Sequence, residues 1–126
     1  MACLACGEAF TTRKQKKFCC LQCSSDWAYQ DFIRRWLDGR EVGYTGKTKE
    51  LSNHVRRYVR EVLGTACSVC GWDERHPVDG AVLTEIDHVD GRAENAVFGN
   101  LRVLCPNCHA KTPTFRARNK NSTRER

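Results

Sequence analysis

Four polar residues in the second half of the chain carry side chains that can bind a metal ion or accept a proton. They are Asp87, His88, Asn100 and His109. A histidine, with a pKa of about 6.5, is neutral enough near pH 7 to take a proton from water. Carboxylate oxygens and imidazole nitrogens together suit Mg²⁺, Mn²⁺, Ni²⁺ or Zn²⁺. These residue types predict metal-assisted hydrolysis, provided that the fold brings them together.

Two Cys-x2-Cys pairs flank this set of residues. Their members are Cys67, Cys70, Cys105 and Cys108. Four thiolates in two such pairs predict one closed, tetrahedral structural zinc site. If Cys108 begins a helix, its side chain and that of His109 diverge by about 100°, so both cannot comfortably bind the same zinc. His109 is therefore available for a different task.

Short strands must position the remaining residues. The pattern predicts a β-strand over residues 81–89, a loop from Asp90, and a second strand over residues 100–104 that leads into the second cysteine pair. Neighbouring residues in a regular strand face opposite sides of the sheet. Asp87 and His88 can therefore serve one site only if the strand bends, bulges or ends there.

A second group of cysteines lies at the N-terminus. The expected ligands of a second zinc are Cys3, Cys6, Cys19 and Cys23. Cys20 could replace Cys19, but the Phe-Cys step before three spacer residues favours Cys19. Disulfides are the rival interpretation, yet no secretory signal pattern is visible, so we expect a reducing cytoplasm in which thiolates bind zinc. The basic loop at residues 13–17 could contact DNA or could serve only the fold of this finger.

Helices are predicted between the two cysteine groups. The first is capped by Ser24 or Ser25 and stops at Gly39, and its apolar stripe consists of Ala28, Phe32, Ile33, Trp36 and Leu37. Residues 40–50 are predicted to be a flexible basic linker. A second helix runs from about residue 52 to residue 63, with an apolar and a basic side. No segment has the roughly 20 apolar residues that a membrane span needs.

The charge distribution favours a polyanionic partner. The formal net charge is +6, but each zinc bound by four thiolates carries about −2 and would offset part of it. Residues 1–66 hold 12 basic and 7 acidic side chains, residues 67–104 hold 3 and 7, and residues 105–126 hold 6 and 1. Basic flanks around an acidic middle suit a nuclease, although two solvated surfaces would have the same composition. Candidate contacts with DNA phosphates are Arg56, Arg57, Arg60, Lys111, Arg116 and Arg118.

The order Cys-x2-Cys, Asp-His, Asn-Leu, Cys-x2-Cys-His over residues 66–113 resembles the HNH endonucleases. More loosely, residues 57–60, 71–72 and 112–115 resemble small phage-encoded HNH proteins. The resemblance implies an α+β fold with a ββα-metal, treble-clef-like nuclease module around the four-cysteine zinc. It also implies Asp87 and His109 as ligands of a catalytic divalent metal, with His88 as the general base. Asn100 would orient that base, and Pro113 predicts that the helix of the module is short.

The sequence therefore predicts a DNA endonuclease that hydrolyses phosphodiester bonds with a histidine-activated water and a divalent metal, with Mg²⁺ or Mn²⁺ favoured. It would nick or cut DNA, as a phage homing or genome-processing enzyme in the cytoplasm of a bacterial host. The alternatives are a non-catalytic zinc-dependent DNA-binding module and, less favoured, a scaffold for protein contacts. We expect a finger at residues 1–25, a helical segment at 26–64, the nuclease module at 65–115 and a mobile basic tail at 116–126.

Overall fold

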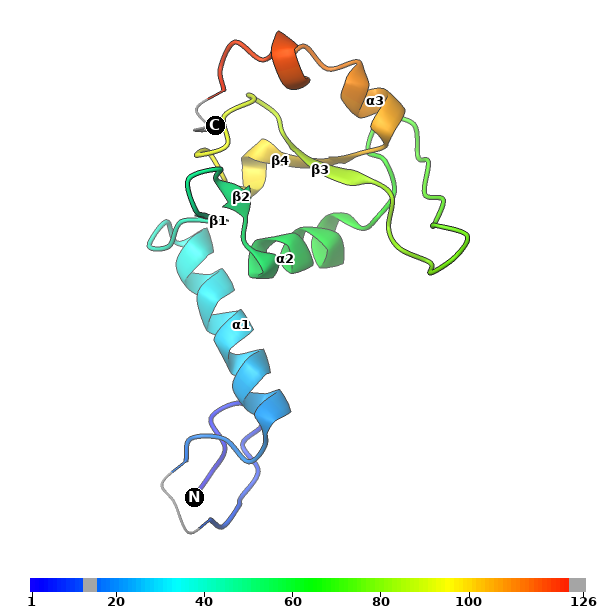
Figure 1. The fold of residues 1–126 in the computed structure, drawn as a ribbon. Coiled ribbons are helices and arrows are strands. Elements are labelled where there is room, and N and C mark those ends of the chain that lie inside the picture. Colours follow the sequence, from blue (N-terminus) through cyan, green and yellow to red (C-terminus); the bar gives the residue numbers. More distant parts are fainter. Residues whose placement is uncertain (13–15, 123–126) are drawn as a thin grey trace. The chain divides into compact units, whose positions relative to one another are not determined.

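The structure is a computed structural model that describes residues 1–12 and 16–122. It consists of two compact units, Met1–Glu41 and Val42–Arg126 (Figure 1). Residues 13–15 of the expected basic loop lie outside the described part of the chain. No helix among the described residues is long and apolar enough to cross a bilayer. The four-part division expected from the sequence stays a prediction.

The first unit contains a short N-terminal segment followed by helix α1 (Leu21–Leu37). The helix begins earlier than the sequence suggested, and the expected Ser24 or Ser25 cap is wrong. Cys20 is the cap, because its sulfur accepts the backbone N–H of Cys23 at 3.5 Å. This arrangement places Cys23 in the first turn of the helix, where its side chain can approach the other cysteines.

The apolar stripe of α1 differs in part from the expected one. Tyr29, Ile33 and Trp36 are buried, whereas Ala28 and Leu37 are exposed. The buried residues still follow the three- and four-residue spacing of one helix face. The sequence therefore predicted the helix and its periodicity correctly, and it misplaced two members of the buried face.

The second unit begins with an antiparallel hairpin of strands β1 (Tyr44–Thr45) and β2 (Glu50–Leu51). Gly46 and Lys49 both have positive φ angles, 69° and 54°, which lets the chain reverse between the strands. The predicted linker at residues 40–50 thus contains the boundary between the two units, but most of it forms this hairpin. Leu51, at the end of the hairpin, is buried.

Helix α2 (Asn53–Leu63) follows the hairpin as predicted. The Ser52 hydroxyl caps it by accepting the Val55 N–H at 3.3 Å, and Gly64 ends it with a φ of 80°. Val55 and Val59 are completely buried, and α2 packs against the strand β4. The helix thus provides one wall for the sheet that carries the candidate site.

Strands β3 (Glu85–His88) and β4 (Leu101–Leu104) form a second antiparallel pair. In this pair Asp87 is opposite Arg102 and His88 is opposite Leu101. Helix α3 (Pro106–Ala110) directly follows β4 and contacts both strands, so the pair lies between α2 and α3 (Figure 1). Short 3₁₀ turns at Phe98–Asn100 and Arg116–Arg118 complete the unit. The short α3 agrees with the expectation drawn from Pro113.

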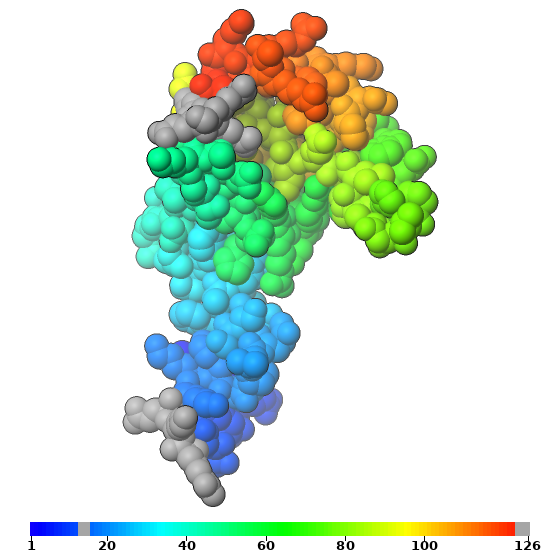
Figure 2. Space-filling model, viewed as in Figure 1, coloured from blue at the N-terminus to red at the C-terminus, as the bar shows by residue number. Residues whose placement is uncertain are grey.

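The first strand of this pair is shorter than the predicted range 81–89. Val82 makes only an isolated bridge with Arg75. The backbone carbonyl of Thr84 accepts a hydrogen bond from Arg60 at 2.6 Å, and its hydroxyl accepts another at 2.8 Å. The first of these bonds uses a backbone carbonyl that could otherwise take part in strand pairing. The loop between α2 and β3 instead projects from the unit, at the right of Figure 2.

Candidate metal and active site

A four-cysteine group in the second unit could hold a zinc ion, as predicted. Its members, whose ligand atoms all lie within 4.8 Å of one another, are Cys67, Cys70, Cys105 and Cys108. Burial raises the pKa of the Cys67 thiol, but hydrogen bonds from the backbone of Cys70 and Cys105 lower it more, to about 6. The thiolate is the form that binds zinc. Cys67, Leu104 and Cys105 are buried together, with Trp72 packed against them, so the site also serves as a small core.

The N-terminal cysteines form the second group that could hold zinc. Its members are Cys3, Cys6, Cys19 and Cys23. The Cys19 sulfur lies 3.7 Å from that of Cys6 and 3.6 Å from that of Cys23. Cys20 is outside the group and caps α1 instead. This geometry supports Cys19, rather than Cys20, as a member of the group that could bind zinc.

Asp87 and His109 come together from β3 and α3 although they are far apart in the sequence. Asp87 Oδ1 lies 3.3 Å from His109 Nε2. The Asp87 side chain is 9% exposed and that of His109 is 22% exposed. Both residues line an open cleft of 480 Å³ that is separate from the four-cysteine group. A carboxylate oxygen and an imidazole nitrogen, both of which could bind a metal ion, therefore face each other in this cleft.

Two further charged residues belong to this cluster and were missed by the sequence analysis. Arg102 Nε donates to Asp87 Oδ2 at 2.9 Å, which compensates the burial of that carboxylate. Glu85 contacts His109 through Nδ1, the other ring nitrogen. Strand periodicity could have indicated Glu85, because residues two apart on a strand share a face. Arg102 could be found only from the register of β3 with β4.

His88 occupies the last position of β3, so the strand ends where the sequence analysis required it to bend, bulge or end. The residue is buried, with 7% of its surface exposed, and its Nε2 atom is buried too. It lines the cleft with Asp87 and His109, and it also lines a second cleft of 400 Å³ beside Arg56 and Arg60. The end of the strand thus brings both neighbours to the same cleft.

Asn100 is buried beside the loop that follows β3. Its amide donates to Asp90 Oδ1 at 2.9 Å and to the Asn95 carbonyl at 2.8 Å, and its oxygen accepts the Asp90 N–H at 3.2 Å. Burial raises the pKa of Asp90, but hydrogen bonds from Asn95, Arg92 and Asn100 lower it below its ordinary value overall. These hydrogen bonds of Asn100 therefore anchor the loop, and Asn100 is not among the residues that line the cleft. Its expected role in orienting the base stays a prediction.

Comparison with known proteins identifies this region. Residues 67–113 match the family model described as HNH endonuclease. These residues form an HNH endonuclease domain. The H-N-H endonuclease F-TflIV of Escherichia phage T5 is 42% identical to the chain over 53 residues, which cover 42% of this chain and 22% of that protein. No solved structure matches the chain.

The C-terminal segment forms a wall of the cleft in the HNH domain. Asn119 donates to the Gly91 carbonyl at 2.7 Å, and Asn121 donates to the Asp90 carbonyl at 3.1 Å. Gly91 has a φ of 74°, and a Cβ atom there would lie 2.6 Å from Asn119 Oδ1. The expectation of a mobile arm from residue 116 is therefore wrong for the described residues 116–122. Side-chain hydrogen bonds to backbone carbonyls attach this segment, and such bonds leave no apolar signal in the sequence.

Three of the six candidate DNA-binding residues lie on α2, and the other three lie in the C-terminal part of the chain. Arg60 is half-buried and bound to Thr84, and burial lowers its pKa, so its guanidinium joins α2 to the segment that leads into β3. Arg56 and Arg57 lie on the surface of the unit. Arg56 is 3.9 Å from a carboxylate oxygen of Glu50, and Arg57 forms an ion pair with Glu61 at 2.8 Å. The remaining residues, all exposed, are Lys111, Arg116 and Arg118. Within that set, the guanidinium of Arg116 stacks over the Phe115 ring at 5.0 Å, and both residues line the cleft.

Proposed function

We propose that this protein is a DNA endonuclease whose HNH domain hydrolyses phosphodiester bonds with the help of a divalent metal ion. The observation that carries the proposal is the 3.3 Å separation of Asp87 Oδ1 and His109 Nε2 in an open cleft. Adjacent ligands of an octahedral ion with bonds of about 2.1 Å lie about 3 Å apart. The pair therefore fits one ion without rearrangement of the fold.

The donor set also fits the chemistry of the reaction. One carboxylate and one imidazole leave several coordination positions for water and phosphate oxygens, unlike a closed four-thiolate site. When bound, a divalent cation stabilises the negative charge that gathers on phosphate and leaving oxygens. Oxygen and nitrogen ligands favour Mg²⁺ or Mn²⁺ and also accept Ni²⁺ or Zn²⁺.

His88 is proposed as the general base that takes a proton from the attacking water. His88 is among the residues that line the same cleft as Asp87 and His109, and a neutral imidazole accepts a proton near pH 7. Asn100 and Asp90 hold the loop that leaves β3 directly after His88. Arg116, Arg118 and Lys111 supply positive charge for DNA phosphates around the cleft. The position of each of these residues is thus compatible with the role proposed for it.

We also propose that β3, β4 and α3 correspond to the ββα-metal, treble-clef-like module, because a helix directly follows the second strand and carries both zinc and active-site ligands. Zinc bound by thiolates favours a reducing compartment such as the cytoplasm of a bacterial host. A role in phage homing or genome processing is suggested by the phage relative alone. Each of these assignments goes beyond the presence of an HNH domain.

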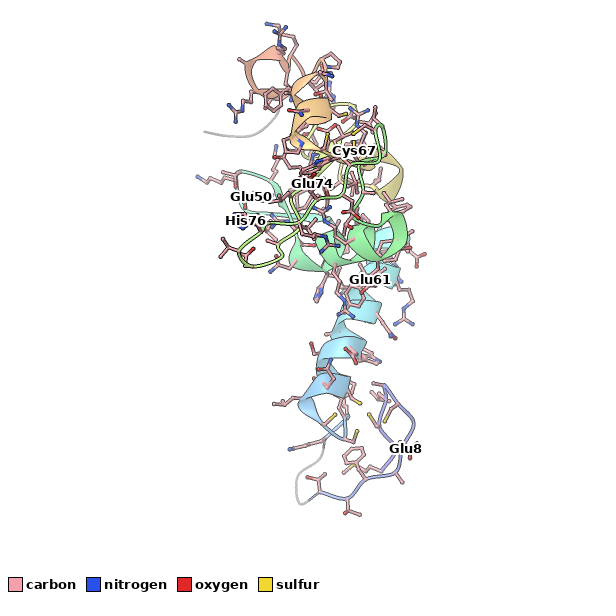
Figure 3. All side chains as sticks on the ribbon, turned by 90° about the vertical axis from the view of Figure 1, so that its right-hand side faces the viewer. Glu8, Glu50, Glu61, Cys67, Glu74 and His76 are labelled. Atoms are coloured by element: carbon pink, nitrogen blue, oxygen red, sulfur yellow. The ribbon has the colours of Figure 1, made fainter. Side chains whose placement is uncertain are left out.

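The test is a plasmid assay with the zinc-loaded chain and added Mg²⁺ or Mn²⁺. We expect supercoiled DNA to become open-circular or linear, which also distinguishes a nick from a double-strand cut. His88→Ala should slow the reaction by about 10²- to 10⁴-fold, the usual contribution of a general base. The control is His76→Ala, in the exposed loop between α2 and β3 (Figure 3).

Two results would contradict the proposal. Plasmid that is bound but stays supercoiled with both metals would favour the non-catalytic DNA-binding module. Cleavage by His88→Ala at the rate of the parent would reject His88 as the base while leaving the nuclease assignment intact.

A further inference from the structure

We infer that Glu85 is a positioning residue that holds the ring of His109 in the tautomer and orientation needed for metal binding. The inference rests on the proposed function, since it concerns the same metal ion. Glu85 and Asp87 are two residues apart on β3 and therefore point to the same side of the sheet, toward α3. His109 lies on α3 and is contacted by both carboxylates.

The two carboxylates contact different nitrogens of the ring. Asp87 lies 3.3 Å from Nε2, whereas Glu85 contacts Nδ1. The nitrogens of an imidazole point away from each other, so a metal held between Asp87 and Nε2 lies on the side of the ring remote from Glu85. This geometry separates the task of Glu85 from that of a metal ligand.

A neutral imidazole has one N–H donor and one nitrogen with a free lone pair, and its hydrogen bonds decide which is which. A carboxylate is an acceptor only, so Glu85 stabilises the tautomer with the proton on Nδ1. The lone pair of Nε2 is then directed toward Asp87 and the cleft, where a cation can bind it. Metal-binding histidines commonly have a carboxylate partner of this kind on the second ring nitrogen.

The remaining contact of the ring agrees with this role. Phe115 meets His109 edge to face, with ring centroids 5.0 Å apart and an angle of 74° between the planes. The phenyl ring limits how far the imidazole can tilt, but it cannot select a tautomer. Within the described part of the cleft, the acceptor that contacts Nδ1 is Glu85.

The experiment measures Mn²⁺ binding by the zinc-loaded full chain, using the electron paramagnetic resonance signal of free Mn²⁺. Glu85→Ala should weaken Mn²⁺ binding by about 10- to 100-fold, the usual effect of removing such a partner. Glu85→Gln should restore most of the affinity, because the amide oxygen still accepts from Nδ1. The matched control is Glu74→Ala, an exposed glutamate on the loop between α2 and β3 (Figure 3), which should bind Mn²⁺ like the parent.

A second readout reports on the ring itself. Because Asp87 is also an acceptor and faces Nε2, long-range ¹H–¹⁵N spectra of the metal-free site should show a higher occupancy of the Nδ1 proton of His109 in the parent and in Glu85→Gln than in Glu85→Ala. Glu85→Ala should shift the population toward the Nε2-protonated tautomer. A purely structural role of Glu85 would lower the melting temperature without changing this ratio.

The outcomes separate this inference from the proposed function. Normal Mn²⁺ affinity and an unchanged tautomer in Glu85→Ala would overturn the positioning role and leave the nuclease proposal untouched. Equal losses of affinity in the alanine and glutamine variants would also overturn it, because they would indicate a direct ligand or a general charge effect. A parent protein that neither binds Mn²⁺ nor cuts DNA would instead reject the proposed function, and with it this inference.

Discussion

Replacing Asn100 by alanine tests whether this residue mainly anchors the loop after β3. The change removes two hydrogen bonds donated by the amide, to Asp90 Oδ1 and the Asn95 carbonyl, and one accepted from the Asp90 backbone. All three partners lie between β3 and β4, in the loop that leaves the sheet next to His88. The loss should therefore disturb the stability of the HNH domain and the position of the base together.

The size of the effect follows from these bonds. A hydrogen bond to a charged acceptor such as Asp90 contributes about 1.5 to 3 kcal/mol, and each neutral bond about 0.5 to 1.5 kcal/mol. Water can replace part of them because Asp90 is only half-buried, so we expect a loss of about 3 kcal/mol. For a domain of this size, each kcal/mol lowers the melting temperature by about 4 to 8 °C. Asn100→Ala should thus melt about 12 to 24 °C below the parent.

Thermal unfolding of the zinc-loaded chain, followed by circular dichroism, measures this difference. Asn53→Ala is the control, because Asn53 is exposed in the first turn of α2 and should change stability by less than about 0.5 kcal/mol. A variant Asn100→Ala that melts within about 3 °C of the parent but no longer cuts plasmid would refute the anchoring role. That result would support the direct orientation of the base implied by the family resemblance.

Two further changes address the zinc site and the C-terminal wall. Cys67→Ser should reduce bound zinc from two ions to one per chain and unfold the HNH domain, because one thiolate of the closed site is lost. Metal analysis by mass spectrometry checks this result. Gly91→Ala should destabilise the domain by about 2 to 4 kcal/mol, because its φ of 74° is strained for alanine and the new methyl group meets Asn119 at 2.6 Å. Faster trypsin cleavage after Arg116 would reveal the released segment.

Each of these changes has a matched control in the same chain. Cys20→Ser should keep both zinc ions, because Cys20 lies outside the two four-cysteine groups. Two zinc ions in Cys67→Ser would contradict the assigned ligands. Gly46→Ala is the control for Gly91→Ala. Gly46 also has a positive φ, 69°, but the new methyl group would have no atom within 4 Å. If both glycine variants lose the same stability, the close approach of Asn119 contributes nothing.

The spacing of cysteines and polar residues made much of the candidate site predictable. Two closely spaced cysteine pairs constrain four sulfur atoms regardless of what separates the pairs, so both four-cysteine groups came together as expected. The end of a strand at His88 could be stated as a requirement because side chains alternate along any strand. Helix α2 was also predictable, since its cap, its apolar spacing and its terminal glycine are all local signals.

The tertiary structure decided which groups actually touch. Arg102 reaches Asp87 only because β3 and β4 pair in one register, and Glu85 reaches His109 only because α3 lies across that face. Asn100 proved to bind the loop, and the C-terminal segment proved to be attached by side-chain hydrogen bonds to backbone carbonyls. Local sequence patterns describe single elements, whereas these contacts join atoms that are distant in the chain. The sequence by itself thus indicated which side chains could bind metal and what chemistry they allow, and only the folded chain determined how each charge is oriented and compensated.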